Sequence, residues 1–415
     1  MDMQVKPRAD APRILVFATA RWQLAARIAI NFLERGCIVS VLAPRGHPAE
    51  CIEGLAAFHR FLPLAPRVTT RRALRVAGAD LVVPCDDAAV LALDDLQRHQ
   101  RQRNSGADRW LPLLERSVGN LEACAFAGSR KDFMTLARDL GLRTPTVIEA
   151  NSAADILEWM AREQRPVVLK TDHSFGGQGV AVVRDAEEAA RTWVRLESRP
   201  GLWRTAIRSL LERDSMPLGR WWREQTAPVS AQAMIEGHAA NRAVACWRGE
   251  VLAGVSVEVL RQQHATGPGT VVRVINSIEM AEAARRLVRH LGVSGFVGFD
   301  FMIEAATGRA YLIEMNARAT PACHLPDSGA AAMTEALLCR LRGEPLPRTV
   351  SRSGPGLIVL FPGEFRSDPS SPYLQATGHD VPWGHPGLVR DGLLPPWSER
   401  GWLARLRRQW FRARG

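Results

Sequence analysis

Two strand-like segments, Phe299-Asp300-Phe301-Met302 and Leu312-Ile313-Glu314-Met315-Asn316, flank a predicted turn and form the hairpin from which the fold can be worked out. Side chains alternate across a strand, so this hairpin places Asp300 opposite Glu314, with Asn316 on the same face. Two like charges that face each other destabilise a strand pair unless a cation lies between them. Oxygen ligands of this kind suit Mg²⁺ that is shared with phosphates, so we expect Asp300, Glu314 and Asn316 to form a metal site. The alternative is a polar sheet face in solvent, which would leave both acids without a basic cross-strand partner.

An arginine follows this hairpin directly, in the segment Ala317-Arg318-Ala319. A guanidinium beside a metal can stabilise negative charge as a phosphoryl group moves, so Arg318 is a candidate catalytic residue. Asn316, in the predicted metal site next to it, is the second candidate. The alternative is an exposed loop arginine.

Lysine is rare in this chain, because only three of its 54 basic residues are lysines. Lysine and arginine are not interchangeable, so the two interior lysines, Lys131 and Lys170, are candidate binding residues. Lys170 ends a predicted strand and precedes a loop that contains Gly176, Gly177 and Gly179. Such a loop presents backbone N–H groups to phosphate oxygens, although a plain glycine hairpin is the alternative. It is not a Walker loop, since no Gly-Lys-Ser/Thr follows.

The order of elements predicts an α/β and α+β multidomain protein. Residues 1–115 alternate apolar strands with helices and predict a parallel sheet. Ala18-Thr19-Ala20-Arg21 follows the first strand where a dinucleotide fold needs glycines, so a nicotinamide or flavin site is not expected. Residues 116–345 form the second predicted domain, with an insertion at about 200–229, and residues 346–415 form a C-terminal extension rich in Pro, Gly and Trp.

The bulk composition is that of a globular protein, with 415 residues, 46% hydrophobic and 23% charged. No run reaches the roughly 20 apolar residues of a membrane span, and we expect a cytoplasmic protein. Seven scattered cysteines predict neither a disulfide framework nor a zinc site. The net charge of +11 is diffuse, so no nucleic-acid partner is expected. The basic tail at 400–415 is either a solvated helix end or a weak peripheral contact with an anionic membrane.

Taken in order, these features resemble the ATP-grasp superfamily, and within it the carbamoyl-phosphate synthetase-like, carboxylate–amine ligase branch. The resemblance covers residues 117–340, and the preceding unit is similar to a Rossmann-like pre-ATP-grasp domain. The motifs that carry it are Ser129-Arg130-Lys131-Asp132-Phe133, Val168-Leu169-Lys170, Gly176-Gly177-Gln178-Gly179, Ala231-Gln232-Ala233-Met234-Ile235-Glu236-Gly237 and Glu314-Met315-Asn316-Ala317-Arg318.

The resemblance implies ATP as the nucleotide and Mg²⁺ as the metal, with Mn²⁺ as a substitute. Lys131, Lys170 and the glycine loop would hold the phosphates. The segment 231–237 would form a hinge that contacts the adenine through Gln232, Met234 and Ile235. Glu236 would replace the acid that binds the ribose in the family, because Ala239 and Ala240 occupy the stretch where that acid is usual.

The activity that the resemblance implies is ligation. A substrate carboxylate becomes an acyl phosphate and is then joined to an amine or another nucleophile, so the expected partners are small carboxylates and amines, with a homodimer left open. A kinase that phosphorylates a small molecule and a non-catalytic ATP sensor are the two alternatives.

Overall fold

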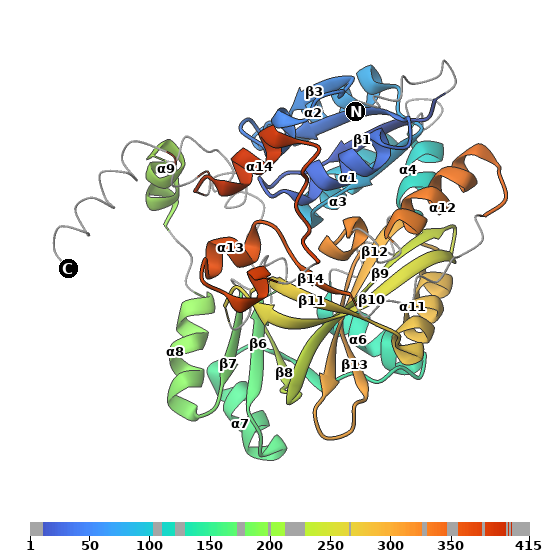
Figure 1. The fold of residues 1–415 in the computed structure, drawn as a ribbon. Helices are drawn as coiled ribbons and strands as arrows, with labels where there is room; N and C mark the ends of the chain where they lie inside the picture. The colour runs from blue at the N-terminus through green and yellow to red at the C-terminus, as the bar shows by residue number, and fades with distance from the viewer. Residues whose placement is uncertain are drawn as a thin grey trace.

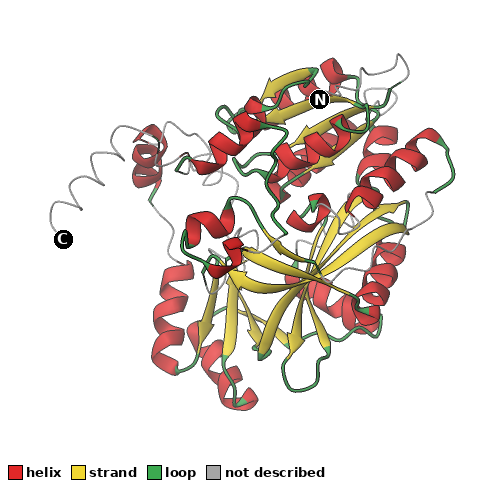
Figure 2. Ribbon diagram, viewed as in Figure 1, coloured by secondary structure: helices red, strands yellow, loops and turns green. Residues whose placement is uncertain are grey.

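The computed structural model divides the chain into an N-terminal α/β unit, two antiparallel sheets and a C-terminal segment that packs across them (Figures 1 and 2). The residues that it describes are 11–102, 110–120, 129–171, 179–197, 201–211, 229–264, 267–325, 330–346, 356–375, 378–395, 397 and 400. Among these residues, no helix has the length and apolar character needed to cross a membrane.

The N-terminal unit is a four-stranded parallel sheet in the order β3-β2-β1-β4. Its strands are β1 (Arg13–Phe17), β2 (Ile38–Ala43), β3 (Ala57–Arg60) and β4 (Leu81–Pro84). Its helices are α1 (Leu24–Leu33), η1 (Pro48–Cys51), α2 (Pro66–Ala77), α3 (Asp87–Gln102) and α4 (Leu111–Ser117). Strands β1, β2 and β4 are almost wholly buried, as near-continuous apolar runs in a parallel sheet should be. The predicted Rossmann-like arrangement is confirmed.

The smaller antiparallel sheet has the order β5-β8-β6-β7. It consists of β5 (Val147–Ala150), β6 (Val167–Thr171), β7 (Val180–Val183) and β8 (Val229–Ala233). The helices of this part of the chain are α6 (Arg130–Asp139), α7 (Ala153–Glu163), α8 (Ala186–Glu197) and α9 (Leu202–Leu211). A small apolar core joins α7 and α8 to the sheet through Ile156, Trp159 and Ala189.

The larger sheet has six strands in the order β13-β12-β9-β10-β11-β14, and all neighbours are antiparallel. Its strands are β9 (Gly237–Trp247), β10 (Glu250–Gln262), β11 (Gly269–Ile275), β12 (Gly295–Glu304), β13 (Ala310–Asn316) and β14 (Leu357–Val359). Helix α11 (Ile278–Leu291) buries its apolar face together with Val244, Val297 and Phe299. Ala243 and Ala245, which alternate with Val244 along β9, belong instead to the core that includes α12 (Ala330–Arg342) and α1. The sheet is therefore covered on both faces.

The C-terminal segment joins the other parts, because it supplies β14 to the larger sheet and a helix to the N-terminal unit. Its short elements are α13 (Gly363–Ser367), η3 (Pro372–Gln375) and α14 (Pro386–Leu393), and α14 contacts η1. Asp380 is 1% exposed and pairs with Arg27 of α1 and, at 2.8 Å, with Nε2 of His324 in η2 (Pro321–His324). One buried carboxylate thus ties three regions of the chain together. The domain limits drawn from the sequence stay predictions.

Candidate active site

The two acidic strands bring the predicted pair of acids together, with a shift in register between Asp300 and Phe301. Asp300 on β12 lies opposite Glu314 on β13, and Gly298 lies opposite Asn316. Burial and the facing charge of Glu314 both disfavour the ionised form of Asp300, and they raise its pKa to about 7. A cation bound between the two carboxylates would offset their mutual repulsion and favour the ionised form of Asp300.

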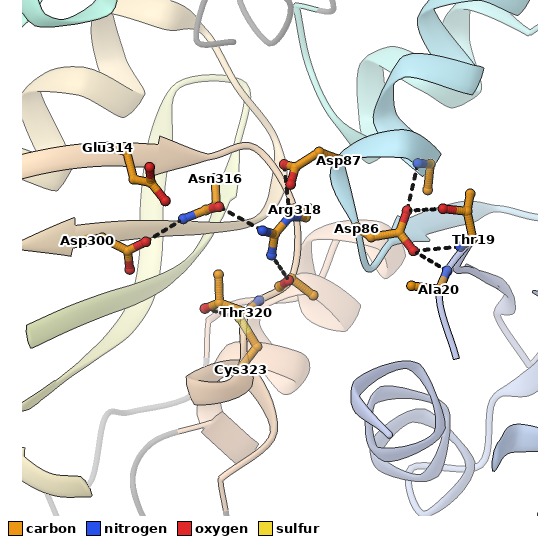
Figure 3. Close-up of polar contacts among 12 residues, drawn as sticks. Thr19, Ala20, Asp86, Asp87, Asp300, Glu314, Asn316, Arg318, Thr320 and Cys323 are labelled. Atoms are coloured by element: carbon orange, nitrogen blue, oxygen red, sulfur yellow. Dashed lines mark hydrogen bonds and ion pairs between the residues drawn. The ribbon is translucent and has the colours of Figure 1, made fainter. Parts of the chain in front are cut away.

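Amide groups hold Asp300 from two sides. Asn316 Nδ2 donates to Asp300 Oδ2 at 2.9 Å, and Asn241 Nδ2 donates to Asp300 Oδ1 at 2.5 Å (Figure 3 shows the Asn316 contact). Asn241 lies directly across from Asp300 on β9, and its own Oδ1 is buried with no hydrogen-bond partner in the described part of the chain. Sequence reasoning missed Asn241, because only the pairing of β9 with β12 brings it to the site.

Two cations face the acidic pair. Lys170, the last residue but one of β6, is 7% exposed. Burial, reinforced by the nearby Arg130, lowers its pKa to about 7 despite the attraction of Glu314 and Asp300. Arg130 Nη2 donates to Glu314 Oε2 at 3.1 Å. Desolvation alone would raise the pKa of Glu314, but Arg130 and Lys170 outweigh it and the pKa lies below its usual value.

The structure does not bring Lys131 to these groups. Its side chain is 59% exposed, and its Nζ pairs with Glu149 Oε2 at 3.2 Å. The preceding residue, Arg130, points inward instead. The rarity of lysine in the sequence favoured Lys131 over Arg130 as a candidate. The phosphate role of Lys131 stays a prediction, and Arg130 is the basic side chain of this motif that the fold places at the acidic pair.

Arg318 lies at the far end of the same cluster and is almost wholly enclosed. Its Nη2 donates to Asn316 Oδ1 at 2.8 Å, its Nη1 donates to the Ala319 carbonyl at 3.3 Å, and its Nε donates to Asp87 Oδ1 at 2.9 Å (Figure 3). Burial opposes the charged form, but carboxylates, chiefly that of Asp87, raise the pKa of Arg318 overall. The guanidinium is therefore cationic and fixed in orientation.

The predicted adenine hinge connects the two sheets, since β8 ends at Ala233 and β9 begins at Gly237. Gln232 is 2% exposed, and its Nε2 has no hydrogen-bond partner among the residues described. The Met234 N–H is already bonded to the Pro166 carbonyl at 3.2 Å, and the Glu236 carbonyl accepts from Ala305 N at 2.9 Å.

The remaining hinge and loop residues are placed only in part. Ile235 is half-buried and Glu236 is exposed. Gly179 directly precedes β7, and its carbonyl accepts from Thr171 N at 3.0 Å, whereas Gly176 and Gly177 lie outside the described residues. All of these nucleotide contacts remain predictions.

The donor set fits a cation shared with phosphates better than a cage made by the protein alone. The described residues contain no group of three or more His, Cys, Asp or Glu side chains that could hold a metal. Two facing carboxylates, with an Asn316 oxygen that already accepts from Arg318 and keeps one lone pair for a metal, leave coordination positions for phosphate oxygens and water, as Mg²⁺ prefers. Lys170 and Arg130, close by, suit a polyphosphate.

A Rossmann-like unit followed by two antiparallel sheets, with acids and cations between them, is the architecture of an ATP-grasp protein. A family model described as "ATP-grasp domain" matches residues 218–322. The chain therefore contains an ATP-grasp domain.

Two kinds of relative support the same fold. The carbamoyl phosphate synthase large chain of Thermus thermophilus is 23% identical over 274 residues, which cover 63% of this chain and only 23% of that protein. The biotin carboxylase domain dimer of the Hydrogenobacter thermophilus 2-oxoglutarate carboxylase, solved with MgADP, ADP and bicarbonate, is 14% identical with a TM-score of 0.58, over 81% of this chain and 71% of that one. Carboxyaminoimidazole ribonucleotide synthase from Aspergillus clavatus, complexed with ATP, is 16% identical with a TM-score of 0.55, over 81% and 78%.

Proposed function

We propose that the chain binds ATP with Mg²⁺ and uses it to activate a carboxylate for ligation to an amine or another nucleophile. The observation that carries the proposal is the register of β12 and β13, which sets Asp300 against Glu314 beside Lys170 and Arg130. Two facing carboxylates next to two cations are an arrangement that suits a metal–polyphosphate complex, because the acids can hold the metal and the cations can hold the phosphates.

In this proposal, Asp300, Glu314 and Asn316 hold the metal, which would neutralise charge on the phosphates when it is bound. Lys170 and Arg130 hold phosphate oxygens. A substrate carboxylate oxygen forms a bond to the γ-phosphorus as the bond to ADP breaks, and Arg318 stabilises the charge on the transferring group. The nucleophile then attacks the carbonyl carbon of the acyl phosphate, phosphate leaves, and an amine nucleophile loses a proton.

The relatives support this chemistry without fixing the substrates. The protein from Aspergillus clavatus is a synthase solved with ATP, and the protein from Hydrogenobacter thermophilus is a carboxylase domain solved with MgADP and bicarbonate. Both proteins were solved with a nucleotide and are named for carboxyl chemistry, and the same class of reaction is proposed for this chain. The particular carboxylate and nucleophile are matters for a screen.

Calorimetry with MgATP tests the first half of the proposal. We expect the wild type to bind and Glu314→Ala to lose binding, while Glu304→Ala, an acid at the solvent-exposed end of the same hairpin, binds as the wild type does. Failure of the wild type to bind MgATP would refute the assignment of the site.

A phosphate-release screen against pooled carboxylates and pooled amines tests the second half. A ligase releases phosphate only when both pools are present. Phosphate that stays attached to a product would point to a kinase, and MgATP binding without any turnover would point to a sensor.

A further inference from the structure

Two consecutive aspartates of the N-terminal unit, Asp86 and Asp87, lie near the site, and their side chains have different surroundings. Asp86 is 2% exposed and accepts four hydrogen bonds, from Thr19 N (2.5 Å), Thr19 Oγ1 (2.9 Å), Ala20 N (3.0 Å) and Ala89 N (2.8 Å) (Figure 3). It fixes the loop after β1 to the start of α3. Asp87, the first residue of α3, points away from this loop and toward the larger sheet.

Asp87 is the carboxylate that meets Arg318. Its Oδ1 accepts from Arg318 Nε at 2.9 Å, and the two side chains are 35% and 11% exposed. Trp22, from the same N-terminal unit, places its ring 5.8 Å from Arg318 Cζ. A buried guanidinium that loses the carboxylate it pairs with would be strongly destabilised, so its position depends on this partner.

The contact also ends a continuous chain of hydrogen bonds. Asp300 accepts from Asn316 Nδ2, Asn316 Oδ1 accepts from Arg318 Nη2, and Arg318 Nε donates to Asp87 (Figure 3). Each link fixes the orientation of the next, because the Asn316 amide can serve Asp300 and Arg318 together in one orientation only. The chain runs from the proposed metal site into the N-terminal unit.

We infer that Asp87 is a positioning residue, through which the N-terminal unit holds Arg318 in the orientation that stabilises a transferring phosphoryl group. The inference rests on the proposed function and adds that the N-terminal unit completes the active site. A surface ion pair would have a marginal effect, whereas a pair that orients an enclosed arginine should act on the transition state.

The test compares two ligands that need no identified substrate: MgADP, and MgADP with aluminium fluoride as a mimic of the transferring phosphoryl group. We expect Asp87→Asn to bind MgADP as the wild type does and to bind the mimic about 10- to 100-fold more weakly, the range for loss of an orienting partner. Arg318→Ala should lose about 100-fold or more for the mimic. The matched control is Asp95→Asn. Asp95 lies on α3, as Asp87 does, but it pairs with Arg67 at the surface, so this variant should bind both ligands as the wild type does.

A second variant separates positioning from folding. Asp87→Glu keeps the charge on a longer side chain, and we expect it to recover part of the affinity for the mimic, while thermal unfolding checks that each variant is folded. Equal binding of the mimic by Asp87→Asn and the wild type would overturn the inference and leave the proposed function standing. A wild type that binds neither ligand would instead overturn the proposed function, and one that binds MgADP without favouring the mimic would remove the role given to Arg318 and Asp87.

Discussion

Binding of MgATP should be accompanied by uptake of a proton at Lys170. Burial lowers the pKa of this ammonium from 10.5 to about 7, which corresponds to a penalty of about 5 kcal/mol on the charged form in the free protein. Near pH 8 only about one tenth of the free protein would then carry the charge. Polyphosphate oxygens favour the ammonium and return the pKa toward its ordinary value, so binding near pH 8 should take up about 0.9 proton.

The direction of the pH dependence follows from this linkage. Because the bound state holds more protons than the free state, the affinity for MgATP should fall as the pH rises above about 7, by up to tenfold per pH unit. Below about pH 7 Lys170 is already protonated and its contribution to the slope disappears.

Calorimetry in two buffers with different ionisation enthalpies measures the proton uptake directly. The matched variant is Lys170→Arg, whose guanidinium stays charged, so its binding heat should show no contribution from this residue and reports the other ionisations, those of Asp300 and of the nucleotide. The same proton count for Lys170→Arg and the wild type near pH 8 would refute the reasoning, because Lys170 would then be charged before the nucleotide arrives.

Three further predictions concern stability. His47 is buried and its pKa is lowered to about 3, so below about pH 6.5 the wild type should lose about 1.4 kcal/mol of unfolding free energy per pH unit relative to His47→Asn, as chemical denaturation at several pH values would show. Gly237→Ala should lower the unfolding free energy by about 1–3 kcal/mol, because the added Cβ would lie 1.9 Å from a carbonyl oxygen of β12. Its control is Gly201→Ala, where no atom lies within 4 Å of the added Cβ, and chemical denaturation should show no change in unfolding free energy. Asp380→Ala should cost about 3–5 kcal/mol, since it leaves Arg27 enclosed without its carboxylate, and a melting temperature equal to that of the wild type would contradict this.

The parts of the site that the sequence predicted are those that depend on local rules. The opposition of Asp300 and Glu314 is predicted from side-chain alternation and the length of one hairpin. The structure has that pairing, but it reaches it through a shift in register between Asp300 and Phe301 that alternation alone does not predict. The hairpin between β9 and β10, outside the site, also obeys a local rule: it turns at Arg248-Gly249, where both residues have positive φ, at 49° and 84°, as a type I′ two-residue turn requires.

The residues that the sequence left out depend on long-range packing. Asn241 and Asp300 are 59 positions apart, and Asp87 and Arg318 are 231 apart, so only the assembled sheets bring them together. The inward position of Arg130 could not be predicted from the sequence for a different reason. Successive helical residues point about 100° apart, so the orientation of α6 against β13 decides which of them meets Glu314.

The scarcity of lysine acquires a physical meaning at Lys170. A guanidinium in an enclosed site stays charged at any accessible pH, and it needs a permanent carboxylate, as Arg318 has in Asp87. An ammonium can lose its proton when no anion is present, because burial brings its pKa to about 7, and it can regain the proton when phosphates arrive. A site that must be stable both without and with a polyanion is therefore better served by lysine than by arginine, which is the distinction that Lys170→Arg measures.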